Sequence, residues 1–437
     1  MEALPLSAAV TVGAPVVALG GVTLFFLKTY INDQKRRSTS LKLPPEVPGL
    51  PVIGNLLQLK EKKPHKTFAK WAETYGPVFS IRTGANTMVV LNSNDVAKEA
   101  MVTRYSSMST RKLSNALKIL TSDKSIVAMC DYNDYYKTIK DIFLRVLWDQ
   151  MLKNDIMFTG ISWNVFRSEI FGLSLKQAIG KDVESIYVEE LGAVLSRKEI
   201  FEILVIHPME GAIEVDWRDF FPYLKWIPNK GFEKRLQQMY SHREAVMKAL
   251  IKEHMKRIAS GEEINCYLDY LVSETNTLSE QQMLMLLWEA IIESSDTTAV
   301  VTEWAMYELS RNPEKQNRLY QDIQNICGYD KITEDKLCQL PYLSAVFHET
   351  LRKHSPVPIV PLRYAHEDAQ LGGYHIPAGS EIAINIYSCN MDKKIWNSPE
   401  DWNPERFLDG KSDLRTYIRL WLSVGERGFV LVLSKQC

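Results

Sequence analysis

A short pattern of charged residues between positions 340 and 408 limits the possible fold of this chain more than any other feature of the sequence. Glu349 and Arg352 lie three residues apart in a run of helical spacing, so on a helix they share one face. An acid and a base beside an apolar stripe predict a partly buried ion pair. Glu-x-x-Arg by itself is more typical of an exposed pair, which contributes only about 0.2–0.5 kcal/mol. The apolar stripe consists of Leu343, Val346, Phe347 and Leu351.

A second arginine follows in the proline-bounded run Asn403-Pro-Glu-Arg-Phe407. Arg406 offers another planar guanidinium, and one carboxylate held by two such groups is a rigid arrangement. Between the two runs lies Pro361-Leu-Arg363, which emerges from a segment rich in proline. The combination of all three runs is far more specific than Glu-x-x-Arg alone.

In this order, the three runs resemble those of the cytochrome P-450 family, the haem-thiolate monooxygenases. The resemblance implies a mainly α fold with small β-sheets (α+β), in which Glu349, Arg352 and Arg406 form a structural triad that locks the core behind the haem. It also implies haem b as the cofactor and O2 as co-substrate. Electrons are expected from an NADPH-dependent cytochrome P-450 reductase.

The amino-acid composition is compatible with this fold but would also suit many other globular folds. The chain has 437 residues, of which 46% are hydrophobic and 24% charged, so it can build a sizeable core. A net charge of −1 gives no reason to expect a nucleic-acid partner. The six cysteines form no C-x-x-C pair and no metal-ligand spacing, which fits a reducing compartment.

The amino end predicts a membrane anchor. No charged residue occurs from Ala3 to Leu27, a run long enough to cross an apolar layer of about 30 Å as a helix. No lysine or arginine precedes the run, and five follow it, which places the next domain on the cytosolic side. The alternatives are a disordered apolar tail and a targeting segment. The five basic residues are Lys28, Lys35, Arg36, Arg37 and Lys42.

We therefore expect four regions along the chain. Residues 1–27 form the anchor, 28–57 a basic and proline-rich hinge, 58–410 an incomplete catalytic domain and 411–437 an aberrant tail. The family resemblance implies a single-pass protein of the endoplasmic reticulum or the plastid outer envelope, with its globular domain in the cytosol.

A second informative segment is a long, mostly apolar helix predicted from Gln281 to Leu309. Its middle, Glu293-Ser-Ser-Asp-Thr-Thr298, contains small polar side chains that compete for backbone hydrogen bonds and can bend a helix. The resemblance assigns Asp296 and Thr297 to the acid–alcohol pair that delivers protons in catalysis, because a hydroxyl can be resupplied from a carboxylate through water. Asp296 as the cap of a second helix is the alternative. Glu293 and Ser294 stand where the family usually has two small residues.

Three further side chains match family positions that hold a haem propionate. They are Tyr136 and Lys140, four apart on an amphipathic helix expected over Tyr135–Leu147, and Arg363. A lysine can meet a carboxylate as a point charge but lacks the arginine fork. From the residues alone, a solvated lysine face is equally compatible.

Turn signals predict two β-hairpins. One joins Val78–Arg82 to Thr87–Leu91, and the other joins Gly373–Ile376 to Glu381–Ile386 around Pro377-Ala-Gly379.

The resemblance breaks near the carboxyl end. The family provides its iron ligand as a cysteine in a Phe-Gly-rich loop, because a thiolate favours O–O cleavage. After Phe407 this chain has only Cys437, without such a loop. Read in a shifted frame with allowed codons, the tail from Asp413 can spell S-A-D-L-Y-K-T-M-A-F-G-G-G-K-R-V-C-A-G. We infer a frame change between Lys411 and Asp413, natural or from gene assignment, that removes the ligand cysteine near Val430 and leaves no metal ligand.

Within the family, the chain resembles the plant ent-kaurene oxidases and related diterpene oxidases, mainly through Thr302–Leu309, Arg363–Asp368 and the aromatic segment Glu210–Pro228. This implies an apolar diterpene substrate. Two hypotheses follow. The first is a membrane-anchored monooxygenase of gibberellin or diterpenoid biosynthesis, inactive as printed because its thiolate is missing. The second is a catalytically silent, truncated, anchored protein that binds no haem as thiolate.

Overall fold

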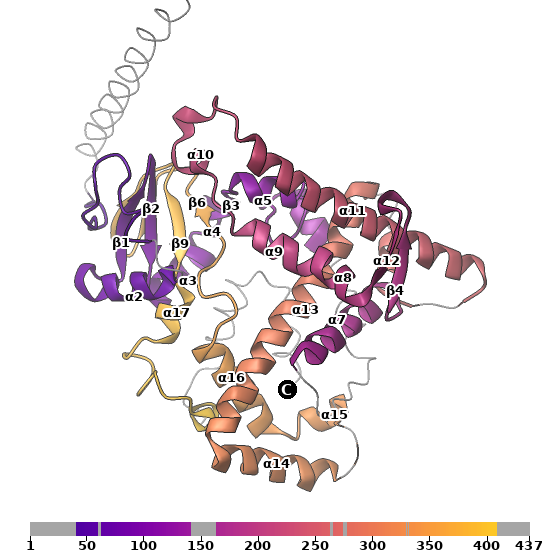
Figure 1. Ribbon diagram of the computed structural model, residues 1–437. Helices are drawn as coiled ribbons and strands as arrows, with labels where there is room; N and C mark the ends of the chain where they lie inside the picture. The colour runs from indigo at the N-terminus through magenta and orange to yellow at the C-terminus, as the bar shows by residue number, and fades with distance from the viewer. Residues whose placement is uncertain are drawn as a thin grey trace, which may run out of the picture.

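The fold combines one sheet-rich side with a larger helical side, as predicted for a mainly α fold with small sheets (Figure 1). Figure 1 shows the main sheet on the left and the long helices on the right and below. The computed structural model describes residues 41–59, 63–140, 163–262, 265–273, 278–328, 330 and 332–408.

The main sheet has five strands in the order β1-β2-β9-β6-β3. The predicted hairpin between β1 and β2 is confirmed: the two strands pair antiparallel, with Val78 opposite Leu91. β2 then pairs parallel with β9, and β9 pairs antiparallel with β6. The strands are β1 Val78–Thr83, β2 Asn86–Leu91, β3 Thr110–Arg111, β6 Arg363–Tyr364 and β9 Glu381–Ile384.

The second predicted hairpin is wrong. β8 (Tyr374–Ile376) pairs with β7 (Ala369–Leu371), while β9 joins the main sheet. The turn lies at Gly372 and Gly373, which have φ values of 55° and 80°. Two consecutive positive φ angles suit a two-residue hairpin turn, and glycine adopts them without strain. A further two-stranded sheet joins β4 (Ser185–Val188) to β5 (Ala193–Ser196).

Helices account for most of the described chain. They are α2 Pro64–Tyr75, α3 Asn94–Lys98, α4 Tyr105–Met108, α5 Asn115–Leu120, α7 Trp163–Ile179, α8 Arg197–Phe201, α9 His207–Ala212, α10 Trp217–Phe220, α11 Lys230–Ala259, α12 Tyr267–Ser273, α13 Glu280–Arg311, α14 Pro313–Cys327, α15 Glu334–Leu337, α16 Pro341–Lys353 and α17 Ile386–Asn390. Two π-helical segments, η1 Glu99–Thr103 and η3 Glu202–Ile206, and three 3-10 segments, η2 Glu189–Leu191, η4 Pro222–Leu224 and η5 Pro404–Phe407, complete the described helical structure that carries a label.

Helix α13 runs through the middle of the molecule and packs against α7 and α16 (Figure 1). It begins at a capping box, in which Ser279 and Gln282 bond reciprocally to each other's backbone. Its amino-terminal half is apolar and buried, with Leu286, Leu287 and Ile291 fully inaccessible. The helix continues without a break to Arg311, so the alternative in which Asp296 caps a second helix is wrong.

The proline-rich segment from Pro44 packs on the sheet where it is described. Val47 N–H donates to Ser80 O at 2.9 Å, and Ser80 N–H donates to Pro45 O at 2.8 Å. Val47 is buried. This part of the expected hinge is therefore extended and docked against β1.

Several expectations lie outside the described residues. They concern the anchor over 1–27, the start of the hinge, the helix beyond residue 140, and the tail over 411–437 with Val430 and Cys437. Of the helices in the described ranges, none combines the length and the apolar character needed to cross a membrane.

Candidate functional site

Glu349 is the centre of a buried ion-pair network between α16 and the loop that leads to η5. Arg352 donates from Nε to Glu349 Oε2 at 2.7 Å and from Nη2 to Oε1 at 2.8 Å. Arg406 Nε lies 3.1 Å from the same Oε1, which also accepts from Asn403 N–H at 2.8 Å. Glu349 and Arg352 are fully inaccessible to solvent, and Arg406 is mostly buried. The structure thus brings the three predicted triad residues together.

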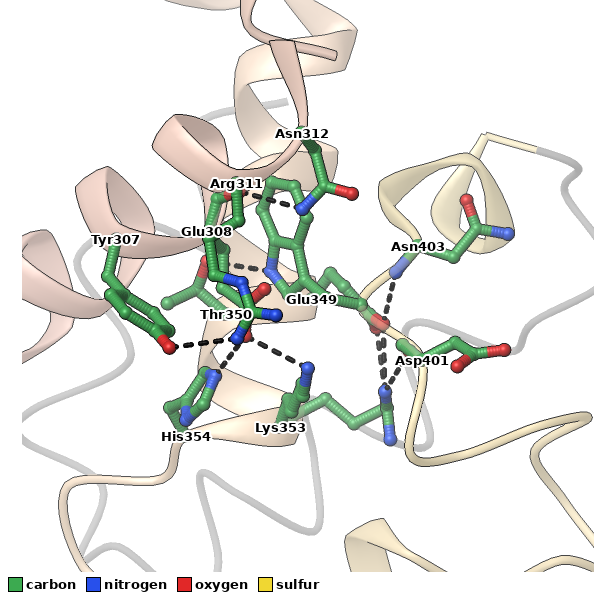
Figure 2. Close-up of polar contacts among 12 residues, drawn as sticks. Tyr307, Glu308, Arg311, Asn312, Glu349, Thr350, Lys353, His354, Asp401 and Asn403 are labelled. Carbon is green, nitrogen blue, oxygen red and sulfur yellow. Dashed lines mark hydrogen bonds and ion pairs between the residues drawn. The ribbon is translucent and has the colours of Figure 1, made fainter. Parts of the chain in front are cut away.

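The remaining donors of both arginines are used by backbone carbonyls. Arg352 Nη1 donates to Asn390 O at 3.0 Å, and Arg352 Nη2 donates to Asp401 O at 3.1 Å. Arg406 Nη2 reaches the same Asp401 O at 3.1 Å. Figure 2 shows Glu349 facing Asn403 and Asp401 across this junction. Because one carboxylate is fixed by two planar cations, the loop is held rigidly against α16.

A second polar junction, not anticipated from the sequence, ties α13 to the end of α16. Glu308 Oε1 accepts from His354 Nε2 at 2.6 Å and from Lys353 Nζ at 2.9 Å (Figure 2). The imidazole of His354 stacks on Trp304 with ring centroids 4.0 Å apart. Burial alone would raise the pKa of Glu308, but the hydrogen bonds from His354 and Lys353 outweigh it and lower that pKa. No sequence spacing links these helices, so only the tertiary structure reveals this junction.

Asp296 and Thr297 lie in the carboxyl-terminal half of α13, both partly buried. Thr297 Oγ1 donates to the Glu293 carbonyl at 2.7 Å, and Ser295 Oγ donates to Ile291 O at 2.7 Å. The small polar side chains thus compete for helix carbonyls, as their types predict. Burial raises the pKa of Asp296, and the charge of Arg167 partly opposes this shift. A carboxyl group whose pKa is raised can release and recover a proton nearer neutral pH.

The expected propionate ligands lie near one another, since Arg363 is on β6 and the phenol of Tyr136 interacts with it. Tyr136 and Lys140 lie on the helical segment 134–140, and Lys140 Nζ is 5.6 Å from the centre of the Tyr136 ring. The Arg363 guanidinium is 5.2 Å from the Tyr105 ring centre and donates to Ser109 O at 3.4 Å. Burial lowers the pKa of Arg363, and the phenols of Tyr105 and Tyr136 raise it in part.

Sequence reasoning missed Arg111, which belongs to the same cluster. Arg111 stands opposite Arg363 in the β3–β6 pairing and is equally buried. Its Nη1 donates to Pro361 O at 2.6 Å. Burial lowers its pKa well below the ordinary value, and the neighbouring Arg363 lowers it further. Two buried guanidiniums side by side make a strongly electropositive position that suits an anionic group. The signal in the sequence was only a lone arginine in Ser109-Thr-Arg111.

A cavity of about 930 Å³ lies next to this cluster, with Arg111 and Cys130 in its wall. Its size is that of a small-molecule site. Charged side chains line much of it, which does not match the purely apolar pocket expected for a hydrocarbon. Of the aromatic segment before Pro228, Phe220 contributes to the wall, whereas Trp226 is 71% exposed. The charged members of the wall include Lys112, Lys118, Lys124, Asp131, Lys225 and Glu381.

Three cysteines of the described residues lie in surroundings that disfavour a thiolate. Burial raises the pKa of Cys130, Cys266 and Cys389 to about 12 in each case. Cys327 is also buried, while Cys338 is exposed. A thiolate ligand requires an electropositive setting that lowers the thiol pKa. The buried surroundings of Cys130, Cys266 and Cys389 do the opposite and raise the thiol pKa.

Comparisons with known proteins agree with the geometry. The sequence matches the family described as Cytochrome P-450 over residues 44–157 and 198–423. It is 65% identical over 437 residues to an ent-kaurene oxidase of Salvia miltiorrhiza, covering 94% of this chain and 84% of that protein. It is 55% identical over 429 residues to ent-kaurene oxidase 2 of Oryza sativa subsp. japonica, covering 92% and 84%.

The fold also resembles solved structures. A zebra fish cytochrome P-450 with progesterone superimposes with a TM-score of 0.63 at 21% sequence identity. The match covers 82% of this chain and 91% of the zebra fish chain. At that identity the likeness concerns the fold alone.

Proposed function

Since this chain belongs to the cytochrome P-450 family of haem-dependent monooxygenases, we propose that, when its thiolate cysteine is in frame, it oxidises a carbon of an apolar diterpene. The observation that carries the proposal is the 65% identity to an ent-kaurene oxidase along 94% of the chain. An identity this high over nearly the whole globule favours a shared substrate class.

The reaction balances with the family's cofactors. One atom of O2 enters a C–H bond of the diterpene, and the other leaves as water. NADPH provides two electrons through a reductase, and two protons are consumed. The haem, when bound, supplies the iron chemistry that activates O2. The residues of the chain bind the cofactor, exclude water and deliver the protons.

The described residues fit the acidic edge of a haem. Arg363 is buried, and its Nε has no hydrogen-bond partner among the residues that the structure describes. A buried donor without a partner indicates a group still to be accounted for. Carboxylates are the natural partner of such guanidiniums. We propose that Arg363 and Arg111, with Tyr136 and Lys140, hold the haem propionates.

The proton path is proposed for Asp296 and Thr297. Thr297 rests on a helix carbonyl and can turn its hydroxyl toward a reacting group, while Asp296 resupplies the proton through water. The raised pKa of Asp296 supports this role, since burial favours its protonated form. The Glu349 triad takes no part in proton transfer; it fixes the loop that precedes the ligand segment.

The thiolate ligand is the part of the site that the described residues do not supply. Burial raises the pKa of Cys130, Cys266 and Cys389, and the family's ligand position falls in 411–437, outside the described ranges. We propose that a reading-frame change near Lys411–Asp413 displaced this cysteine and that the printed chain does not turn over. The poor thiols favour the second candidate function, a silent anchored protein, for this exact sequence.

The activity test compares two full-length proteins. One has the printed tail, and the other has the tail read in the shifted frame. Each is combined with a cytochrome P-450 reductase, NADPH and ent-kaurene, and oxygenated diterpene is measured. We expect product only from the restored chain, and none when its shifted-frame cysteine is replaced by serine. A restored chain that binds haem but oxidises no diterpene would contradict the proposed substrate class.

We also propose that residues 1–27 anchor the protein to the endoplasmic reticulum or the plastid outer envelope, with 28–57 as the connection to the catalytic domain over 58–410. The uncharged run from Ala3 to Leu27 and the basic residues after it support this. Removing residues 1–27 should move the protein from the membrane pellet to the supernatant after a high-salt wash. Full retention in the pellet would contradict anchoring by this segment.

A further inference from the structure

Two carboxyl groups, Glu289 and Glu293, lie one turn apart in the buried middle of α13. Glu289 is completely inaccessible. Its Oε2 accepts from Val127 N–H and its Oε1 from Ala128 N–H, each at 2.7 Å. These two bonds fix the turn after α5 to α13. They also stabilise the negative charge of Glu289, since both donors point at carboxylate oxygens.

No backbone N–H donor to the carboxyl group of Glu293 is found among the described residues. It is partly accessible, and among the described residues its carboxyl group interacts with Glu289. Burial raises the pKa of Glu293 well above its usual value, and the neighbouring Glu289 charge raises it further. Burial also raises the pKa of Glu289, but the two backbone donors lower it in part. Two carboxyl groups this close resist ionising together, so the pair retains a proton, and the two backbone N–H groups that donate to Glu289 favour its placement on Glu293.

Among the described residues, the other titratable groups that interact with the pair are acids. Tyr267 on α12 interacts with both carboxyl groups, and Tyr135 and Cys130 interact with Glu289. None of these three neighbours carries a positive charge, so none of them stabilises the charged form of Glu293 through an ion pair.

The pair is aligned with the expected acid–alcohol pair. At 3.6 residues per turn, positions 289, 293, 296 and 297 fall within an arc of about 100° on α13. Residues three and four apart on a helix are neighbours on its surface. The backbone of Glu293 already contacts Thr297, whose Oγ1 donates to the Glu293 carbonyl at 2.7 Å. The stored proton thus lies one helical turn from the hydroxyl.

We propose that Glu293, positioned by the backbone-anchored Glu289, is a proton store that recharges the Asp296–Thr297 pair. Glu293 gives its proton to the pair after a transfer and regains one from solvent, so no other reactant is needed. It acts through Thr297 and Asp296 and does not touch substrate. The inference rests on the proposed function for its consequence in turnover, whereas the protonation of Glu293 is a property of the chain alone.

The first experiment measures that protonation by infrared spectroscopy on the full-length printed chain at neutral pH. A protonated buried carboxyl group gives a carbonyl band that shifts in D2O. We expect Glu293→Gln to remove this band, Glu293→Asp to retain a band at a changed frequency, and Glu303→Gln, at an exposed position of the same helix, to leave it unchanged. Glu289→Gln should make the band titrate at lower pH. A band that survives Glu293→Gln, or no band at all, would overturn the proposal.

The second experiment uses the chain with the restored tail, reductase and ent-kaurene. Glu293→Gln should raise the fraction of NADPH electrons that leave as hydrogen peroxide and lower diterpene product, with haem content unchanged. Glu303→Gln should do neither. Equal peroxide release in Glu293→Gln and the parent would overturn the relay. Failure of the restored parent to make product contradicts the proposed function instead, and the infrared result, obtained without haem, then decides Glu293 by itself.

Discussion

Arg111 and Arg363 stand directly opposite each other on β3 and β6, with both side chains buried and their guanidinium groups bonded to the backbone carbonyls of Pro361 and Ser109. Like charges opposite each other on paired strands destabilise a sheet. Such an arrangement persists where an anionic group is bound between the two cations. It is the part of the structure that most directly supports a cofactor with carboxylate side chains.

This pair leads to a prediction in which stability and function change in opposite directions. Replacing Arg363 by methionine removes a buried charge, so the printed chain should be unchanged or more stable by about 1–4 kcal/mol in urea unfolding. The same change in the restored chain should weaken haem retention in dialysis. Exposed Arg104→Met serves as the control and should alter neither measurement. Strong destabilisation of the printed chain would show that Arg363 has a structural partner.

Alanine substitutions in the Glu349 network should lower the free energy of unfolding more when the replaced arginine is more deeply buried. Arg352→Ala leaves a buried carboxylate with one cation fewer, so the free energy of unfolding should fall by about 3–5 kcal/mol. Arg406→Ala should lower it by about 1–3 kcal/mol, because Glu349 keeps Arg352 and Asn403 as donors. Arg318→Ala, which removes an exposed pair with Glu405, should change it by less than about 1 kcal/mol. Equal unfolding midpoints for Arg352→Ala and the parent would contradict the network's importance.

Buried His348 should make stability depend on pH. Its Nδ1 donates to Ser344 O at 2.7 Å, and its Nε2 has no partner in the described residues. Burial lowers the pKa of His348 below 6.5, and the bond to Ser344 O opposes this in part. The unfolded chain therefore binds a proton more readily, so stability present above pH 6.5 is lost as the pH falls through that value.

The measurement is urea unfolding between about pH 7.5 and 5.5. His348→Gln keeps a donor for Ser344 O and should reduce the loss of stability over this range. Exposed His366→Gln should leave the loss as it is in the parent. An identical pH dependence in His348→Gln and the parent would show that His348 does not contribute.

Proton delivery can be separated from cofactor binding in the restored chain. Asp296→Asn removes the ionisable group while keeping its size, so product formation should fall by about 10²-fold or more. Thr297→Val removes the hydroxyl and should act in the same direction with more hydrogen peroxide. Haem content should stay at the parent value in both variants. Unchanged product rates would remove Asp296 and Thr297 from the mechanism.

Local patterns in the sequence predicted those parts of the fold that local physics decides. The Glu349–Arg352 pair could be found because three-residue spacing beside an apolar stripe places both groups on one buried face. The β1–β2 hairpin and helix α13 follow equally from turn residues and periodicity. Arg406 could be assigned to the triad only because it lies in a proline-bounded loop whose sequence resembles that of the family.

The rest depended on tertiary pairing that no local pattern encodes. Arg111 joins Arg363 only because β3 and β6 become neighbours, and Glu308 meets His354 only because α13 packs against α16. The wrong hairpin shows the same limit: Pro377-Ala-Gly379 has turn chemistry, yet Gly372-Gly373 makes the hairpin. β9 is buried along its whole length and is taken into the main sheet.

Our central proposal is that this chain, which belongs to the cytochrome P-450 family, has the scaffold of a haem-thiolate monooxygenase and lost its ligand cysteine through a reading-frame change. The most direct test is the carbon-monoxide difference spectrum of the reduced proteins, recorded for the printed and the restored chain at equal haem supply. The account predicts the thiolate-haem band for the restored chain and no such band for the printed chain. A thiolate-haem band from the printed chain, or its absence from the restored chain, would contradict the account.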